Sequence, residues 1–130
     1  MLHPSQFEVN EAWILFRLNN APIRTDADGD FNCVALMDAA SCFILGSECI
    51  PAAAAEPTRA EFRRLLENGK RHKQQLPRTL FVAREYAADR VTLEATEQGI
   101  EVVRVPEGEL LVFIGEARDA FAERFEDTPP

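Results

Sequence analysis

Asp38 is the carboxylate whose surroundings most invite a chemical interpretation. It stands between two apolar runs in the stretch VALMDAASCFILG, with Ser41 three residues after it. A carboxylate at a strand end could take part in a reaction. Aspartate and serine also form hydrogen bonds to the backbone within tight turns, however, and this spacing favours that role. We therefore expect Asp38 to close a hairpin between two strands.

A basic segment, residues 59–78, is the second candidate. It holds seven Lys and Arg against two Glu, whereas the other residues hold seven Lys and Arg against twenty acids. The net charge of −8 disfavours nucleic acid as a general partner. The segment could still contact phosphates or an acidic protein, although charge runs usually form a solvated helix face. The candidate anion- or partner-binding residues are Arg63, Arg64, Lys70, Arg71 and Lys73.

The sequence contains no motif with the residue spacing of a known metal or cofactor site. The stretch DADGDFN resembles a calcium loop, but counting from Asp26 the sixth residue is Phe31 and the twelfth is Met37, where glycine and glutamate are needed. A turn with exposed acids fits better. The two histidines lack ligand partners, and no phosphate-binding glycine loop occurs. We expect no cofactor and no metal, and we expect three small buried thiols at Cys33, Cys42 and Cys49.

The chain has 130 residues and is expected to form a single domain over 1–130, with flexible ends at 1–11 and 126–130. Strands are predicted at 12–19, 31–38, 41–50, 78–83 and 100–105. Helices are predicted from Thr58 to about Gly69, at 84–99 and at 107–125. The first helix could continue another turn through KRHKQQLP, and the start of the last could be a short strand. No apolar run is long enough to span a bilayer and the N-terminus does not resemble a secretory signal, so a cytoplasmic location is expected.

The element order βββαβαβα predicts an α/β fold with a mixed five-stranded sheet and helices on both faces. The predicted interior is well filled and leaves no obvious cavity for a small molecule. Trp13 and Tyr86 are expected in the core or at its edge. The predicted core residues are Ile14, Phe16, Val34, Leu36, Phe43, Leu45, Phe62, Leu66, Phe81, Val91, Val102, Val103 and Phe121.

This order, together with several short motifs, resembles the ribonuclease H-like fold and in particular the cores of integrases and transposases. WILF at Trp13–Phe16 is similar to the Trp-x-x-Asp of that family's first strand. VALMDAASCFILG is similar to its second hairpin, and Pro77 precedes the fourth strand as in the family. EQGIEVVRVP resembles its following helix and strand. The resemblance covers residues 12–125.

The resemblance implies a degenerate domain, because the family's chemistry needs carboxylates that hold two divalent cations. Phe16 stands at the first carboxylate position, and Ala83 and Arg84 stand at the second. Glu116 or Asp119 could supply the third. We expect no catalytic residues and a non-catalytic domain that binds a protein, either another chain or its own copy.

Two alternatives remain open. One is a divergent metal-dependent nuclease whose acids have migrated among Asp38, Glu85, Glu116 and Asp119. The other is an anion- or nucleic-acid-binding module that uses residues 63–73. Carboxylates that converge in space would favour the nuclease, because a metal ion is what usually holds such charges together.

Overall fold

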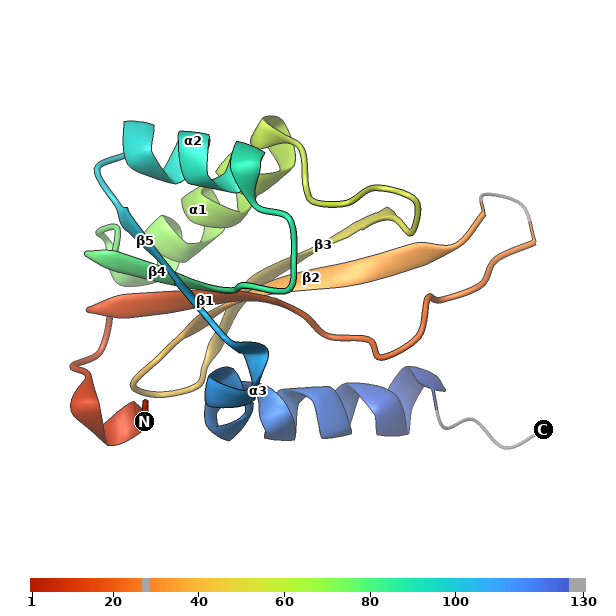
Figure 1. Cartoon of the computed structure of the whole chain (residues 1–130), viewed down its shortest axis with the longest axis horizontal. Helices are drawn as coiled ribbons and strands as arrows, with labels where there is room; N and C mark the ends of the chain where they lie inside the picture. The colour runs from red at the N-terminus through yellow and green to blue at the C-terminus, as the bar shows by residue number, and fades with distance from the viewer. Residues whose placement is uncertain (27–28, 127–130) are drawn as a thin grey trace.

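A mixed five-stranded sheet forms the centre of the computed structural model, which describes residues 1–26 and 29–126 (Figure 1). The strand order is β3-β2-β1-β4-β5. Strands β1, β2 and β3 form an antiparallel meander, and β4 and β5 lie parallel to β1. The strands are β1 (Ala12–Arg17), β2 (Phe31–Asp38), β3 (Ile44–Pro51), β4 (Thr79–Ala83) and β5 (Glu101–Val105).

Helices cover both faces of the sheet, as predicted. Figure 1 shows α1 (Arg59–Lys73) and α2 (Asp89–Glu97) on one face and α3 (Glu107–Phe121) on the other. Successive side chains of a strand point to opposite faces. Trp13 and Leu15 therefore belong to the core under α1 and α2, whereas Ile14 and Phe16 belong to the core under α3. The predicted mixed α/β architecture is confirmed.

Helix α1 begins where the sequence predicts but ends later. The Thr58 hydroxyl accepts a hydrogen bond from the Glu61 amide at 3.1 Å, and the Glu61 carboxylate accepts one from the Thr58 amide at 2.8 Å. The predicted end near Gly69 is wrong, because the helix continues to Lys73 and closes at Gln74, whose φ is 65°. The extra turn that the sequence left open is present.

Gly69 serves packing rather than termination. It lies directly against the indole of Trp13, and a Cβ at this position would stand 2.6 Å from Trp13 Cη2. Only a residue without a side chain allows the helix to approach the sheet this closely. Gly99, by contrast, follows α2 with a φ of 81°, which fits its predicted role after the helix.

Two further expectations need correction. Helix α2 starts at Asp89, not at Arg84, because the residues between them form a turn after β4. Phe43, which we expected in the core, is 49% exposed. Its ring lies 5.5 Å from the His72 ring and 5.7 Å from the Lys73 ammonium, so it contacts the end of α1 rather than the interior.

The chain ends were expected to be flexible. A short 3-10 helix, η1 (Pro4–Gln6), precedes Phe7, whose ring contacts Phe81 at 5.6 Å and Phe113 at 6.1 Å. After α3 the chain makes a π-helical turn, η2 (Ala122–Glu126), and residues 127–130 lie outside the described residues.

Residues 27–28 of the predicted acidic turn also lie outside the described residues. No helix in the described part is long and apolar enough to cross a membrane.

Candidate binding site

The candidate site lies where the carboxyl ends of β1 and β4 meet, which is the edge of an α/β sheet that usually carries function. Three arginines from three elements lie near it: Arg17 ends β1, Arg104 lies in β5 and Arg118 lies in α3. Arg118 contacts the Arg17 carbonyl, and Arg17 and Arg104 both contact Tyr86. We call these three arginines the arginine cluster. Tyr86, which follows β4, and Glu107, which begins α3, complete the group.

Arg118 and Glu107 form a bidentate ion pair within α3. The two Nη atoms of Arg118 donate to the two carboxylate oxygens of Glu107 at 3.3 Å each, and Arg118 Nε donates to the Arg17 carbonyl at 2.9 Å. Burial by itself would raise the pKa of Glu107, but hydrogen bonds from Arg118 and then Tyr86 outweigh it and lower that pKa. Glu107 therefore stays ionised and fixes Arg118 against the end of β1.

Arg104 holds the turn that follows β4. Its Nη2 donates to the carbonyls of Ala83 at 2.9 Å and of Arg84 at 3.3 Å, and also to the carbonyl of Tyr86. The Arg104 guanidinium thus holds the backbone of residues 83–86 in place. This backbone sets the position of the Tyr86 side chain.

Tyr86 and Arg17 stack at the edge of this group. The Arg17 guanidinium lies 5.5 Å from the centre of the Tyr86 ring, within the range of a cation–π contact. Arg17 Nε donates to the Asn19 carbonyl at 3.0 Å. Burial is the main cause that raises the pKa of Tyr86, followed by its hydrogen bond with Glu107. The phenol is therefore protonated near neutral pH.

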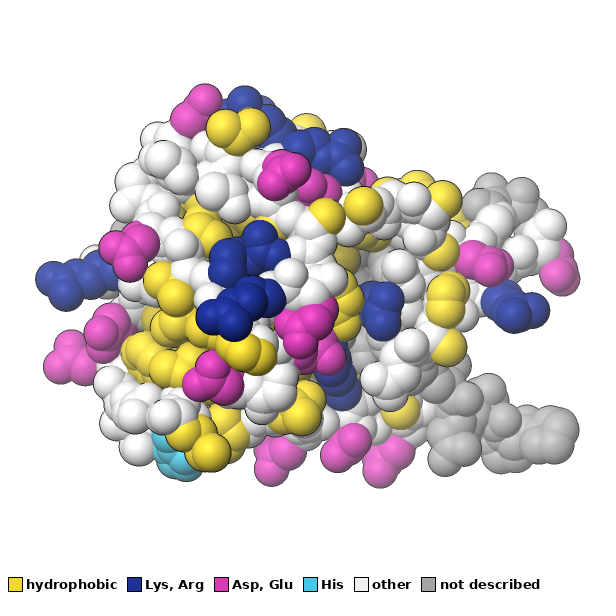
Figure 2. All heavy atoms as spheres, viewed as in Figure 1, with side chains coloured by type: hydrophobic (Ala, Val, Ile, Leu, Met, Phe, Trp, Pro, Cys, Tyr) yellow, Lys and Arg dark blue, Asp and Glu magenta, His cyan; other side chains and the backbone are white. Residues whose placement is uncertain are grey.

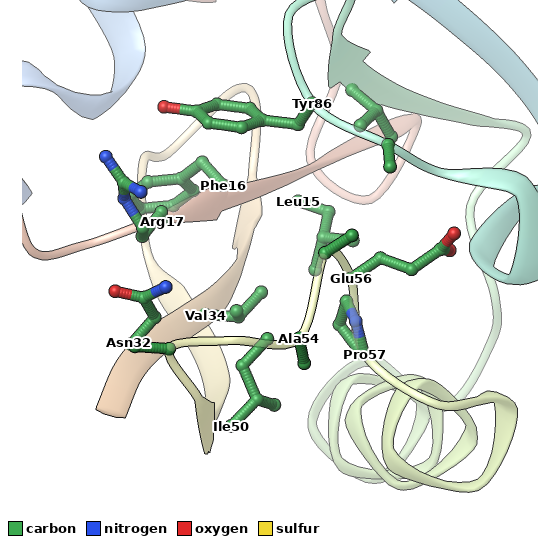
Figure 3. Close-up of a pocket in the computed structure, with 14 residues that line it drawn as sticks. Leu15, Phe16, Arg17, Asn32, Val34, Ile50, Ala54, Glu56, Pro57 and Tyr86 are labelled. Carbon is green, nitrogen blue, oxygen red and sulfur yellow. The ribbon is translucent and has the colours of Figure 1, made fainter. Parts of the chain in front are cut away.

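A pocket of about 250 Å³ opens beside Arg17 and Tyr86. Figure 3 shows the polar ends of Arg17, Tyr86 and Asn32 on one side of it and the Glu56 carboxylate on the other. The expectation of a filled interior is wrong here, and the connector after β3 lines the pocket with the small side chains of Ala52, Ala54 and Ala55. The apolar walls come from Leu15, Val34, Ile50, Ala54 and Val82.

Glu56 is a structural carboxylate that the sequence did not reveal. It is 7% exposed and accepts hydrogen bonds from the amides of Asp89 at 3.0 Å, Arg90 at 2.8 Å and Val91 at 3.1 Å. These amides form the N-terminus of α2, which lacks a side-chain cap of its own. Glu56 thus occupies the positive end of a helix that could otherwise bind an anion.

Comparison with known proteins gives structural matches alone. No family model and no curated protein matches the chain. A bovine immunodeficiency virus (BIV) integrase catalytic core matches with a TM-score of 0.53 and 12% identity, over 93% of this chain and 75% of that one. A chain of the simian T-cell lymphotropic virus intasome in complex with the PP2A regulatory subunit B56γ matches with a TM-score of 0.51 and 11% identity. That match covers 99% of this chain but 45% of the viral one. The chain has the ribonuclease H-like fold.

Within this ribonuclease H-like fold, the acids weighed for metal binding have separate positions. Asp38 accepts from the Asn10 amide at 2.6 Å, the Ser41 amide at 2.9 Å and the Ser41 hydroxyl at 2.7 Å, so it closes the hairpin as expected. Glu85 accepts from the Glu107 amide at 3.0 Å, at the start of α3. Glu116 and Asp119 lie on the exposed side of α3. The described residues contain no group of three His, Cys, Asp or Glu that could hold a metal ion.

Phe16, Ala83 and Arg84 are the residues that the resemblance matched with the family's first two carboxylate positions. Phe16 is 4% exposed and packs under α3, and Ala83 is 2% exposed in the same core. Arg84 is exposed in the turn held by Arg104. Sequence reasoning missed the arginine cluster, since Arg17, Arg104 and Arg118 are far apart in the chain and follow no motif.

Two of the predicted basic residues form ion pairs within the domain. Arg63 Nη2 lies 3.0 Å from Glu94 and Arg64 Nη2 lies 2.6 Å from Glu48. Lys70 and Arg71 are exposed in the last turn of α1, beside Lys73. On the face in Figure 2, Lys and Arg side chains are interspersed with Asp and Glu. An interaction role for Arg63, Arg64, Lys70, Arg71 and Lys73 stays a prediction.

Proposed function

We propose that this chain is a non-catalytic binding domain built on the ribonuclease H-like fold. The observation that carries the proposal is the arginine cluster near the carboxyl ends of β1 and β4, in a structure whose described residues hold no group of acids that could bind a metal ion. Two-metal phosphodiester chemistry depends on anionic ligands there. Guanidinium groups remain charged at all ordinary pH values and repel divalent cations at short range.

The binding site in this proposal is the pocket beside Arg17. Its volume of about 250 Å³ is small for an enzyme's substrate, since ligand pockets usually measure about 300–1,000 Å³. It suits one apolar side chain, inserted as an anchor residue by a protein partner. Arg17 at the rim favours a neighbouring carboxylate on that partner. The partner is another protein or a second copy of this chain.

A thermal melt with millimolar Mg²⁺ or Mn²⁺ tests the non-catalytic part. A ligand that binds only the folded state raises the melting midpoint. We expect the midpoint to be the same with either cation and with a chelator. A rise with Mn²⁺ that disappears in the double variant Glu116→Gln, Asp119→Asn would contradict the proposal and favour the nuclease alternative.

An NMR titration tests the pocket, with acetyl-Leu-Asp amide as the probe and acetyl-Leu-Asn amide as its neutral match. We expect the acidic probe to shift the amide signals of Val34 and Ile50 more strongly than the neutral one, because Arg17 faces the added charge. Arg17→Gln should remove this difference, whereas Arg24→Gln, at an exposed arginine outside the pocket, should preserve it.

Filling the pocket provides the decisive variant. Ala54→Leu places a larger side chain on the pocket wall and should abolish binding of both probes. A melting curve of this variant checks that it remains folded. Equal binding by the variant and the unmodified chain would reject the pocket as the binding site.

A further inference from the structure

Cys33 and Cys49 face each other across the β2–β3 hairpin. They are direct register partners, and their Sγ atoms lie 3.5 Å apart as free thiols. Figure 1 shows these strands running side by side. The pair lies toward the open end of the hairpin, away from the turn that Asp38 closes. Cys42, the third thiol, lies in that turn.

The backbone decides what this pair can form. The Cys33 carbonyl accepts from the Leu18 amide at 2.8 Å, and the Cys33 amide donates to Asn19 Oδ1 at 2.8 Å. Both backbone groups therefore point toward the β1 side, so Cys33 and Cys49 form a non-hydrogen-bonded pair of the antiparallel ladder. Such pairs have Cα atoms about 4.5 Å apart and their side chains close together. This separation lies within the range of about 4.4–6.8 Å that disulfides span.

Access differs between the two thiols. Cys49 is exposed on the edge strand β3, whereas Cys33 is 9% exposed on β2. Burial, and then the hydrogen bond with Cys49, raise the pKa of Cys33 to about 12. An incoming oxidant therefore meets Cys49 first, and Cys33 is placed to react next with the Cys49 sulfur.

We propose that Cys33 and Cys49 are a thiol–disulfide exchange site for low-molecular-weight disulfides such as oxidised glutathione. The Cys49 thiolate attacks one sulfur of the oxidant, forms a mixed disulfide and releases one glutathione thiolate. Cys33 loses its proton to solvent, attacks the Cys49 sulfur and releases the second glutathione thiolate. Two protein thiols are oxidised to one disulfide, and one small disulfide is reduced to two thiols.

The product would fasten the edge strand to the sheet. A bond between Cys33 and Cys49 closes the hairpin covalently at its open end. Cross-links of this kind restrict the unfolded chain, so the oxidised protein should melt at a higher temperature than the reduced one. The inference is independent of the proposed function, since neither cysteine lines the pocket.

Mass spectrometry of the full chain tests the proposal. The reduced protein is incubated with oxidised glutathione, denatured in acid and alkylated with N-ethylmaleimide. We expect the protein to lose the mass of two hydrogens and to accept one maleimide, at Cys42, in place of three. A protease digest should link the peptides that contain Cys33 and Cys49. The variant Cys42→Ser should form the same bond and accept no maleimide.

The single variants separate the steps. Cys33→Ser should retain one glutathione on Cys49, because the second attack is lost, and Cys49→Ser should gain no intramolecular bond. Three outcomes would overturn the proposal. These are three maleimides on the treated protein, a glutathione that persists on Cys49 of the unmodified chain, and a covalent dimer through Cys49.

Discussion

At the scale of single residues, Gly69 shows how one missing side chain sets the packing of α1. A Cβ there would stand 2.6 Å from Trp13 Cη2 and 2.8 Å from Cζ3, and the indole is fully buried. The indole also donates to Asn10 Oδ1 at 2.8 Å, so it cannot move without losing a hydrogen bond. We expect Gly69→Ala to lower the free energy of unfolding by about 1–3 kcal/mol, the usual cost of overpacking. Urea denaturation measures this change.

Gly115 in α3 is the matched control, because a Cβ added there meets nothing within 4 Å. Gly115→Ala should raise the free energy of unfolding by up to about 1 kcal/mol through helix propensity. Equal stabilisation by both substitutions would show that Trp13 does not constrain α1 as described.

At the scale of elements, α2 depends on a carboxylate from a distant connector. Glu56 accepts from three amides at the start of α2 at 2.8–3.1 Å, and Ala88 at the N-cap offers no side-chain acceptor. Glu56→Ala should lower the free energy of unfolding by about 1–3 kcal/mol, because buried donors lose their acceptor. The same substitution should speed hydrogen exchange at the amides of 89–91 and leave exchange in α3 unchanged.

The exposed Glu67 of α1 provides the comparison for this substitution. Glu67→Ala should change the free energy of unfolding by no more than about 0.5 kcal/mol, as is usual at the surface. An effect of Glu56→Ala within that same margin would mean that the connector does not hold α2.

At the scale of the whole molecule, Glu94 joins α1 to α2 and makes stability depend on pH. It is 1% exposed, and its carboxylate accepts from Arg63 at 3.0 Å and from Arg59 at 3.1 Å. Hydrogen bonds from Arg63, and then from Gln98, lower its pKa from 4.5 to about 2. A carboxyl with a lower pKa in the folded state stabilises that state above its unfolded pKa. Its contribution is lost as the pH falls from about 4.5 to about 2.

We expect this carboxylate to contribute up to about 3 kcal/mol near neutral pH, given that one pKa unit corresponds to about 1.4 kcal/mol. Glu94→Gln should reduce the fall in unfolding free energy between pH 5 and pH 2, measured by urea denaturation at each pH. An unchanged pH dependence in that variant would assign acid sensitivity to other carboxylates.

Much of the fold could be predicted from local patterns. Apolar alternation and the turn residues located all five strands, and the Thr58–Glu61 capping box located the start of α1. The hydrogen bonds of Asp38 with Ser41 were also predictable, because both partners lie within one turn. Each of these features depends on residues that are neighbours in the chain, so the sequence by itself determines them.

Tertiary structure decided the features whose partners are distant in sequence. Gly69 follows the pattern of a helix end, but the helix continues to Lys73 and Gly69 packs against Trp13. Glu56 caps a helix that starts 33 residues later in the sequence. Arg118 donates a hydrogen bond to the carbonyl of Arg17, which lies 101 residues earlier in the sequence. The arginine cluster and the pocket arise only when elements from separate parts of the chain lie side by side, and the Cys33–Cys49 pair depends on the register between β2 and β3. The elements follow from short-range chemistry, whereas the candidate sites follow from which strands the fold makes neighbours.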